Sequence, residues 1–588
     1  MSSSQTRLQQ LKRMLDPDTP ILGWMLYYQR AYLTGDILAG LTIAVMLVPQ
    51  SIAYALLAGL PPVMGLYASI LPVMLYGFLG SARVLSLGPT AITSVMTFGT
   101  IGILATSTGI SLSTLAITLA LLLGGVYLIM GILRLGFLVN FLSRPVLVGY
   151  INAAAIIIVI GQLQHLLGIT VESSALPHML LWRTLNNLST FNPVTVLIGV
   201  GGIVTLLFIR YGLSPILLRI GIAEEWRFLL SRSGALVLVM VTVGLVFQYD
   251  LHLTADVAII GEIPSGFPAL TIGFDFTHWR PLLLGAIAIA FVGFMEDIST
   301  AKSLLKGRDQ LLKPTQELFA MGVANVASAV TGGMPVTTSV SRSVVNYEAG
   351  GKTGLSSIIA GTMLALTVIF LTRFFYYLPR PTLAAIIITS VVGLIDIKTL
   401  QKLWGYSRAE TGVMLATTIS VFFFSIEIGI FIGILLSIIV YIYRTSRTPI
   451  VELGRDRQRD FYSDIDDDWT LPIPHVAILR IDESIYFMNA QFLDRYLRNL
   501  IAKRQDVRYL VLVCSGVNTL DTSSIQILEA VVKDFHDVGV EVLISEMRAR
   551  SMLQIKRGDL HTIIGNERFF ETTHDAILAT GLLPDDVI

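Results

Sequence analysis

The sequence predicts a polytopic, all-α membrane domain followed by a small α/β domain, and three observations point to this fold class. The chain of 588 residues is 54% hydrophobic and 14% charged, with a mean hydropathy of +0.72. A soluble globule of this size needs more polar surface than this composition supplies. Apolar stretches run almost continuously from Leu33 to Tyr443. The charged segment VELGRDRQRDFYSDIDDDW follows shortly after them. Short apolar strands then alternate with helices towards the C-terminus.

These changes in hydropathy and charge divide the chain into four parts. We predict a cytoplasmic N-terminal arm at 1–32, a transmembrane domain at 33–448, a linker at 449–474 and a cytoplasmic C-terminal domain at 475–588. The first residues, MSSSQTRLQQLKRMLDPDTP, contain no apolar core of the length that a cleavable signal peptide requires. We therefore expect the N-terminus to stay in the cytoplasm.

Charge and cysteine usage exclude several classes of protein. Lys plus Arg and Asp plus Glu balance at 41 each, so no overall basic character indicates nucleic acid as a partner. The one cysteine, Cys514, excludes an internal disulfide framework and a cysteine metal cluster, and its apolar strand predicts a buried packing role. Because the sequence contains no P-loop, metal-ligand cluster or nucleophile with its base, we expect no enzyme and no cofactor.

The membrane domain contains about ten clear spans near the ~20 residues that cross a bilayer. Clear examples are 112–133, 194–209, 281–294 and 412–424, whereas 84–107 and 331–350 are interrupted by Gly, Pro, Ser and Thr. A plain hydropathy count therefore underestimates the number of crossings.

Basic residues predict the orientation of the chain. Four connections are rich in Lys and Arg, namely the N-terminal arm and the segments 210–232, 302–313 and 444–459. All four should face the cytoplasm, whereas 250–278 carries Asp and Glu without Lys or Arg and suits the other side. With both termini inside, fourteen crossings fit every connection, in a multi-pass protein of a bacterial inner membrane.

Two breaks in the apolar pattern predict half-helices. In SLGPTA (86–91), the Gly-Pro pair indicates an extended stretch followed by a helix that begins at Pro89. In GGMPVTTSVSRS (332–343), Ser341 is the expected N-cap of a helix that enters from the other side. The alternative is that both segments are kinked spans.

Two helix N-termini that meet near mid-membrane make an anion site. Their free N–H groups and dipoles favour negative charge, and broken helices in matching halves are typical of transporter binding sites. Arg342 would supply a positive counter-charge there, although it could instead be a fixed partner for a carboxylate or for backbone carbonyls.

Glu296 is a second ionisable residue of this membrane domain. It follows an apolar run, and Thr300 lies on the same helical face, so the two could form a site for a proton or for Na⁺. The alternative is that Glu296 lies at the inner interface beside Asp297 and Lys302. The residues leave this choice open.

Long segments of the chain resemble a known transporter family. PQSIAYALLAGLPPVMGLY, SLGPTAITSVM, GFMEDISTAKSL, QELFAMGVANVASAVTGGMPVTTSVSRSVVNYEAGGKT and IEIGIFIGILLSIIVYIYRTSRT look like successive motifs of the SulP anion transporters, also called solute carrier family 26. The resemblance implies two inverted seven-helix repeats of the uracil-permease type, a core domain that moves against a gate domain, and a homodimer.

The resemblance also implies roles for individual residues. The anion would lie among seven residues: Gln50, Tyr54, Gly88, Thr90, Ala91, Ser341 and Arg342. Position 296 is the acidic coupling position of the family. A Glu there resembles members proposed to use protons, whereas Na⁺-dependent bicarbonate members have Asp with Thr one turn later. Because this chain also has Thr300, the coupling ion stays open, with H⁺ favoured over Na⁺.

The C-terminal segment predicts a compact α/β domain. Its order is VAILRI, QFLDRYLRNLIAK, YLVLVC, SSIQILEAVVKDF and VEVLIS, and it resembles the STAS domain that SulP proteins share with anti-sigma-factor antagonists. Ser523 matches the phosphorylated position of the antagonists, but Ser524 replaces the usual Gly, and DTSS also reads as a helix N-cap. A cytoplasmic protein partner of this domain is a further expectation.

Together these features predict a secondary active transporter of a small inorganic or carboxylate anion. Sulfate is the expectation from the frequency of substrates in the family, and a proton is the favoured coupling ion because position 296 is Glu. The alternatives are Na⁺-coupled bicarbonate transport, proton-coupled dicarboxylate transport and a weakly coupled anion channel.

Overall fold

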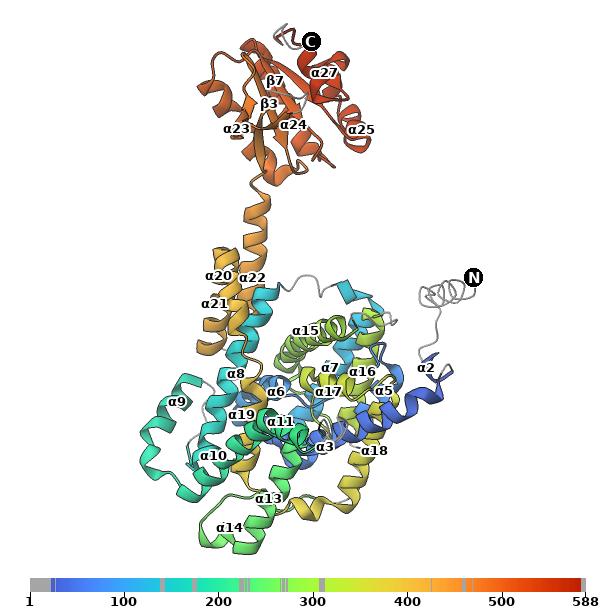
Figure 1. Ribbon diagram of the computed structural model, residues 1–588, viewed down its shortest axis with the longest axis vertical. Helices are drawn as coiled ribbons and strands as arrows, with labels where there is room; N and C mark the ends of the chain where they lie inside the picture. Colours follow the sequence, from blue (N-terminus) through green and yellow to red (C-terminus); the bar gives the residue numbers. More distant parts are fainter. Residues whose placement is uncertain are drawn as a thin grey trace. The chain divides into compact units, whose positions relative to one another are not determined.

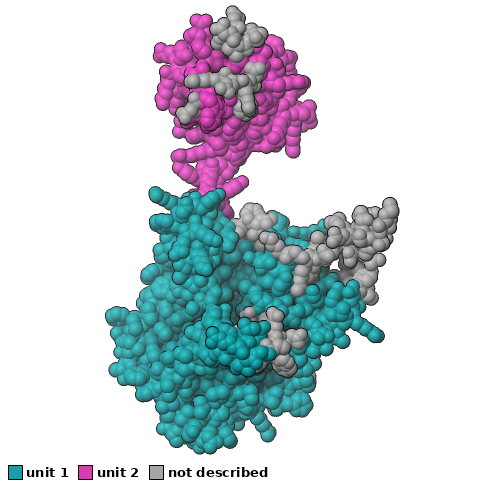
Figure 2. All heavy atoms as spheres, in the orientation of Figure 1, with its two compact units in different colours: residues 1–437 teal, residues 438–588 magenta. Residues whose placement is uncertain are grey.

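The computed structural model describes residues 23–26, 28–137, 143–171, 177–221, 227, 230, 233–264, 266, 270, 273–305, 312–424, 426–456, 462–467 and 469–582. The chain divides into two compact units, residues 1–437 and 438–588, coloured separately in Figure 2. The division falls inside helix α22 (Ile426–Thr445).

The first unit is built from two series of helical segments (Figure 1). The first series is α3 (Leu33–Leu57), α4 (Pro62–Tyr67) with α5 (Leu71–Leu79), α6 (Ala91–Thr108), α7 (Leu112–Ile132), α8 (Arg144–Leu167), α10 (Pro193–Leu207) and α13 (Gly234–Tyr249). The second is α15 (Trp279–Leu304), α16 (Pro314–Val330), α17 (Val340–Glu348), α18 (Leu355–Phe370), α19 (Arg380–Val392), α21 (Arg408–Phe423) and α22.

Short helices connect these segments. They are α2 (Gly23–Leu26), η1 (Arg30–Tyr32), α9 (Pro177–Asn186), η3 (Leu188–Thr190), the π-helical turn η4 (Phe208–Leu213), α11 (Ser214–Arg219), α14 (Leu251–Thr254), η5 (Thr372–Phe375) and α20 (Ile397–Tyr406).

The packing of the two series shows that they are repeats of one another. Helix α3 packs on α18 as α15 packs on α7, and α5 packs on α18 as α16 packs on α7. Likewise α8 packs on α21 as α19 packs on α10. In each pair of contacts, replacing every helix by the helix at the same position in the other series converts one contact into the other. The predicted 7 + 7 inverted-repeat architecture is therefore confirmed.

The same contacts separate a core from a gate. The first four segments of each series pack together through α3, α5, α7, α15, α16 and α18, and this group is the core. The gate is formed by α8, α10 and α13 with α19 and α21. Helices α3, α6 and α13 carry the contacts between the two groups, α3 to α19, α6 to α8 and α13 to α3.

Hydropathy alone recovers only part of this fold. Among the described residues, nine helices are long and apolar enough to cross a membrane, and two shorter apolar helices, α13 and α18, accompany them. The predicted spans at 112–133, 194–209, 281–294 and 412–424 correspond to α7, α10, α15 and α21. Helices α16 and α17 do not pass the same test because they are short and carry polar residues, as expected for segments surrounded by protein.

The second unit contains a mixed sheet with helices around it (Figure 1). Its strands are β3 (Ile450–Asp456), β4 (Tyr462–Asp464), β5 (Thr470–Leu471), β6 (Val476–Ile481), β7 (Tyr509–Val513), β8 (Glu541–Ser545) and β9 (Phe569–Phe570). The order is β4-β3-β6-β7-β8-β9, with β5 paired to β3, and β6 to β9 are parallel. The helices are α23 (Phe487–Lys503), α24 (Thr522–Asp537), α25 (Ala549–Arg557), α26 (Leu560–Ile564), η6 (Asn566–Arg568) and α27 (Thr573–Leu578).

The segment 449–474 differs from the linker that its charges predict. It holds β3, β4 and β5, and β3 pairs antiparallel with β6 from Ile450 opposite Ile481 to Leu453 opposite Ile478. Charged residues inside and after β3 hide its short apolar pattern in the sequence. The segment therefore belongs to the C-terminal sheet.

Candidate functional site

Two short strands bring together the two segments in which the apolar pattern is interrupted. Strand β1 (Leu87–Gly88) pairs antiparallel with β2 (Thr337–Thr338), with Leu87 opposite Thr338 and Gly88 opposite Thr337. The Ser339 N–H extends the pair by donating to the Ser86 carbonyl at 2.9 Å. Because each strand leads directly into a half-helix, the antiparallel pairing sets α6 and α17 with opposed N-termini.

Each half-helix begins two residues away from its predicted position. Helix α6 begins at Ala91 and not at Pro89, because Thr90 has an extended backbone and its hydroxyl caps the helix by accepting from the Thr93 N–H. Helix α17 begins at Val340, and its N-cap is Ser339, whose hydroxyl accepts from the Arg342 N–H.

Ser341, the predicted N-cap, lies instead in the first turn of α17 and is exposed. Its hydroxyl is 3.3 Å from that of Ser339.

The Arg342 guanidinium is fully buried and reaches from α17 to the other half of the site. Its Nη1 donates to the Gln50 side-chain carbonyl at 3.0 Å and to the Pro89 carbonyl at 3.1 Å. Its Nε lies 3.4 Å from the Ser86 hydroxyl. Among the described residues, Nη2 has no hydrogen-bond partner. Arg342 therefore holds backbone carbonyl and amide oxygens with one part of its guanidinium and keeps a donor nitrogen free.

Gly88 makes room for this arginine. Its φ is +144°, and a Cβ at this position would lie 3.0 Å from Nη2 of Arg342. A residue with a side chain would strain the backbone and also crowd the guanidinium, so the position requires glycine.

Gln50 and Tyr54 approach from α3, and both are buried. Gln50 is bound to Arg342, as described above. Tyr54 interacts with Ser390 of α19 and electrostatically with Arg342. Because α3 belongs to the core and α19 to the gate, Tyr54 connects the site to the gate.

Three threonine hydroxyls form a cluster at the meeting point. The hydroxyl of Thr337 lies 3.1 Å from that of Thr90 and 2.6 Å from that of Thr93, and Thr90 lies 3.0 Å from Thr93. Thr93 and Thr337 were not among the predicted site residues. The threonine run VTTS before the second half-helix is the signal in the sequence that could have revealed Thr337.

Glu296 and Thr300 lie on α15, and both side chains are buried. One turn earlier, a Cβ on Gly293 would meet the Tyr127 hydroxyl and the Thr337 side chain. Positions 293, 296 and 300 share one face of the helix, so Glu296 and Thr300 lie on the face of α15 that packs towards the threonine cluster. Both residues therefore lie inside the protein.

The polar groups around the meeting point are mainly donors and hydroxyls. They comprise the Arg342 guanidinium, the opening N–H groups of two helices and the hydroxyls of Thr90, Thr93 and Thr337. Such a set can hold a small anion by charge-assisted hydrogen bonds.

The predicted regulatory residue lies in the second unit. Ser523 is exposed in the first turn of α24, whose N-cap is Asp521. The Asp521 carboxylate accepts from the N–H groups of Ser524 and Phe487, both at 2.8 Å. Burial acts to raise the pKa of Asp521, but these hydrogen bonds outweigh it and hold the pKa below its ordinary value. DTSS is therefore a helix cap in this structure.

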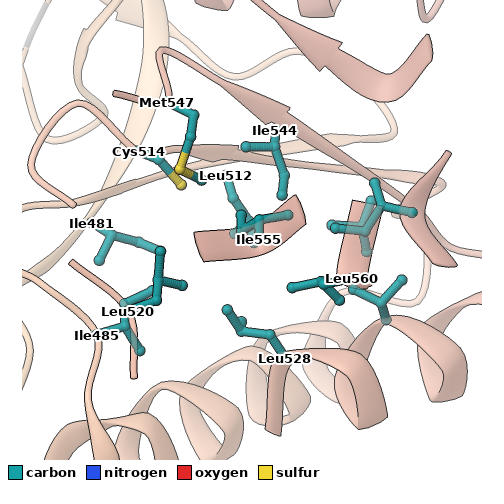
Figure 3. A pocket seen from close by; sticks show the side chains of 13 residues that line it. Ile481, Ile485, Leu512, Cys514, Leu520, Leu528, Ile544, Met547, Ile555 and Leu560 are labelled. Carbon is teal, nitrogen blue, oxygen red and sulfur yellow. The ribbon is translucent and has the colours of Figure 1, made fainter. Parts of the chain in front are cut away.

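Cys514 is buried, as its strand predicts. It lines an apolar cavity of about 20 Å³ together with residues such as Leu512, Met547 and Ile555 (Figure 3). Burial raises the pKa of its thiol to about 12, so this cysteine is inert at neutral pH.

Comparisons with known proteins agree with this architecture. The model of the sulfate permease family matches residues 33–417, and that of the STAS domain matches residues 471–576. Sulfate transporter 4.1, chloroplastic, of Arabidopsis thaliana is 32% identical over 96% of this chain and 84% of its own length. A probable sulfate transporter of Mycobacterium tuberculosis (strain CDC 1551 / Oshkosh) is 31% identical over 94% of this chain and 96% of its own length.

Solved structures match the whole fold. SLC26A9 superposes with a TM-score of 0.86 at 22% identity, over 98% of this chain and 94% of its own. The transmembrane domain of the cyanobacterial bicarbonate transporter BicA superposes with a TM-score of 0.57 at 23% identity, over 70% of this chain and 98% of its own. Family model, relatives and fold agree, and they place the protein among membrane transporters and not among enzymes. The chain belongs to the sulfate permease family and carries a C-terminal STAS domain.

Proposed function

We propose that the protein is a secondary active transporter of sulfate, held between the N-termini of α6 and α17 and taken up with a proton. The observation that carries this proposal is the Arg342 guanidinium, buried where two half-helices meet, with one nitrogen free among the described residues. The printed names of relatives at 31% and 32% identity support sulfate as the anion.

Alternating access follows from the division into core and gate. The anion contacts β1, α6, β2 and α17, whereas the gate reaches the site through α19. Separation of Tyr54 from Ser390 would open the site to one side without disturbing the Arg342 contacts. The site then moves with the core, as rigid-body models of transport require.

Glu296 is the proposed proton-coupling residue. A negative ion bound beside β2 and a neutral Glu296 stabilise one another, because the protonated carboxyl removes a like charge. This reciprocity is a coupling free energy, so anion and proton enter together. The Na⁺ alternative would use Thr300 and the Glu296 carboxylate as oxygen ligands.

The proposal includes the surroundings of the transporter. We place it in the inner membrane of a bacterium with both termini in the cytoplasm, as a homodimer. The STAS domain would offer Ser523 and the start of α24 to a cytoplasmic partner protein.

Uptake into proteoliposomes tests the function. Purified protein should accumulate radiolabelled sulfate when the inside is made alkaline, and unlabelled sulfate should compete better than bicarbonate or fumarate. Accumulation driven by a Na⁺ gradient at fixed pH would show that the coupling ion is Na⁺ and not H⁺. If sulfate only flows down its own gradient and no ion gradient drives its accumulation, the protein is a channel. If fumarate or bicarbonate competes better than unlabelled sulfate, that anion is the substrate.

A further inference from the structure

Besides Glu296, two further buried carboxyls lie near β2. Asp297 follows Glu296 on α15, and Glu317 lies in the first turn of α16; both side chains are 0% exposed. Helix α15 packs on α16, and the two carboxyls interact with one another. Neither residue is needed by the transport scheme above.

The donors around the pair are unequally distributed. Glu317 accepts three hydrogen bonds, from the Tyr76 hydroxyl at 2.7 Å and from the Ser81 hydroxyl and Ala82 N–H at 2.6 Å each. Both carboxyl oxygens of Glu317 therefore already accept hydrogen bonds.

Asp297 has a different environment. Its Oδ1 accepts from the Thr338 hydroxyl of β2, whereas its Oδ2 has no donor among the described residues. The neighbour of Asp297 is the Glu317 carboxyl, so an acceptor faces an acceptor. A proton on one of the two groups turns this contact into a hydrogen bond.

The strongest influences on Asp297 carry no positive charge. The titratable groups around the pair are Tyr76 of α5, which donates to Glu317, Tyr127 of α7, and Glu296 on the same helix as Asp297. The groups that act most strongly on Asp297 are Glu317, Thr338 and Tyr76, and none of the three is a cation. Two buried carboxyls that face one another ionise together only at a high cost in free energy.

We propose that Asp297 and Glu317 hold one proton between them, and that this second proton site, separate from Glu296, fastens β2 to α15 and α16. The proton sits on Asp297 and is donated to the Glu317 carboxylate. The other oxygen of Asp297 then holds Thr338, which lies opposite Leu87 in the β1–β2 pair. Loss of this proton sets two negative charges against one another and loosens β2, and with it the start of α17.

Infrared spectroscopy of the full-length protein tests the proton directly. Difference spectra between neutral and strongly alkaline buffer should contain the C=O band of a protonated carboxyl. This band should shift when the protein is grown with aspartate that carries heavy carbon in its side-chain carboxyl. It should persist in Glu296→Gln and disappear in Asp297→Asn.

Asp36 is the matched control because it is also fully buried but accepts from the Lys352 and Thr353 N–H groups and from the Thr353 hydroxyl. Asp36→Asn should therefore keep the band. Absence of an aspartate band in the native protein, its loss in Asp36→Asn, or its survival in Asp297→Asn would each overturn the proposal. Because labelling uses the native chain, the test holds even if Asp297→Asn does not fold.

A pH profile tests the consequence for the site. Asn at 297 can accept from Thr338 and donate to Glu317, so it imitates the protonated acid. In the Glu296→Gln background, which removes the pH dependence that comes from Glu296, sulfate affinity should fall in alkaline buffer by up to about tenfold per pH unit. The double variant that also carries Asp297→Asn should give a flat profile. Equal profiles would overturn the link to β2. This arm rests on the proposed function, but the infrared arm does not, so the two failures are distinguishable.

Discussion

At the scale of single residues, Arg342 combines two roles that the sequence leaves as alternatives. It fixes the Pro89 carbonyl and Gln50, and it offers a free nitrogen to an anion. A bound anion would therefore complete a set of bonds that is already partly formed, which reduces the reorganisation on binding.

Arg342→Ala should abolish sulfate binding and also lower stability, by about 3 kcal/mol, because it leaves buried acceptors unpaired. Sulfate should raise the melting temperature of the parent and not that of the variant. Arg280→Ala, an exposed arginine at the start of α15, is the control and should keep the sulfate effect. A folded Arg342→Ala protein with unchanged sulfate affinity would remove Arg342 from the site.

Gly88→Ala should lower stability by about 1 to 3 kcal/mol and weaken sulfate binding, because the left-handed backbone and the nearby guanidinium both oppose a Cβ. Gly109→Ala is a matched control. Gly109 also has a positive φ of +73°, but no atom lies within 4 Å of a Cβ there. It should lose stability without losing affinity. Thermal denaturation and sulfate titration on both variants check this difference.

The sequence reached some of these residues and not others. Arg342, Gly88 and Gln50 stand in recognisable motifs, so their positions were predicted. Thr93 and Asp297 were not singled out, because their importance depends on which segment faces them. Thr93 meets Thr337, and Asp297 meets Thr338 and Glu317, from segments far apart in the chain.

At the scale of elements, the sequence predicted the broken segments but not their pairing. Strands β1 and β2 have two residues each, too short for an alternating pattern. The helix starts were displaced for a local reason. Thr90 and Ser339 use their hydroxyls as caps. Ser339 and Ser341 are the same residue type, so the sequence does not decide between them, whereas the Gly-Pro pair places the predicted start of α6 before Thr90.

Helix α24 offers a test of capping. Since the folded pKa of Asp521 lies below its unfolded value, its carboxylate adds stability above the unfolded pKa, and this contribution is lost as the pH falls through the folded pKa. Asp521→Ala should cost about 1 to 2 kcal/mol at neutral pH, and Asp521→Asn less, because Asn also caps helices.

Hydrogen exchange of peptides from α23 and α24 at neutral and acidic pH measures this effect. Asp534→Ala, which loses only an exposed ion pair with Arg498, is the control and should change exchange little. Equal protection of α24 in Asp521→Ala and the parent would contradict the capping role.

At the scale of the whole molecule, the boundary between the units decides which truncations are meaningful. A chain that ends near Arg455 would keep β3 without its partner β6 and expose an unpaired strand edge. A chain that ends at Thr448 removes the entire sheet. We expect the Thr448 truncation to keep sulfate uptake within about tenfold of the parent, because every proposed site residue precedes it.

The Arg455 truncation is the comparison and should aggregate more readily. Gel filtration and uptake measured on both proteins check this expectation. A monodisperse Thr448 truncation without uptake would show that the STAS domain takes part in the transport step.

Coupling also belongs to this scale. Glu296→Gln imitates the protonated carboxyl, so binding should survive while the response of uptake to a pH gradient disappears. Thr300→Val distinguishes the ions, since it should impair uptake if Na⁺ binds there and leave proton-driven uptake intact otherwise. Continued accumulation by Glu296→Gln in response to a pH gradient alone would exclude Glu296 as the coupling residue.

The β1–β2 pair has a consequence for biogenesis. One strand comes from each repeat, so while the ribosome is still making the connection after α13, the first repeat carries an edge with no partner. Segments that are synthesised first can insert into the membrane first. The β1–β2 pair, however, cannot form until residue 338 has left the ribosome. The centre of the membrane domain is therefore assembled late, by closure of one of the longest loops in the fold. A nascent chain stalled before β2 would contain the seven segments of the first series and two of the second, but no binding site.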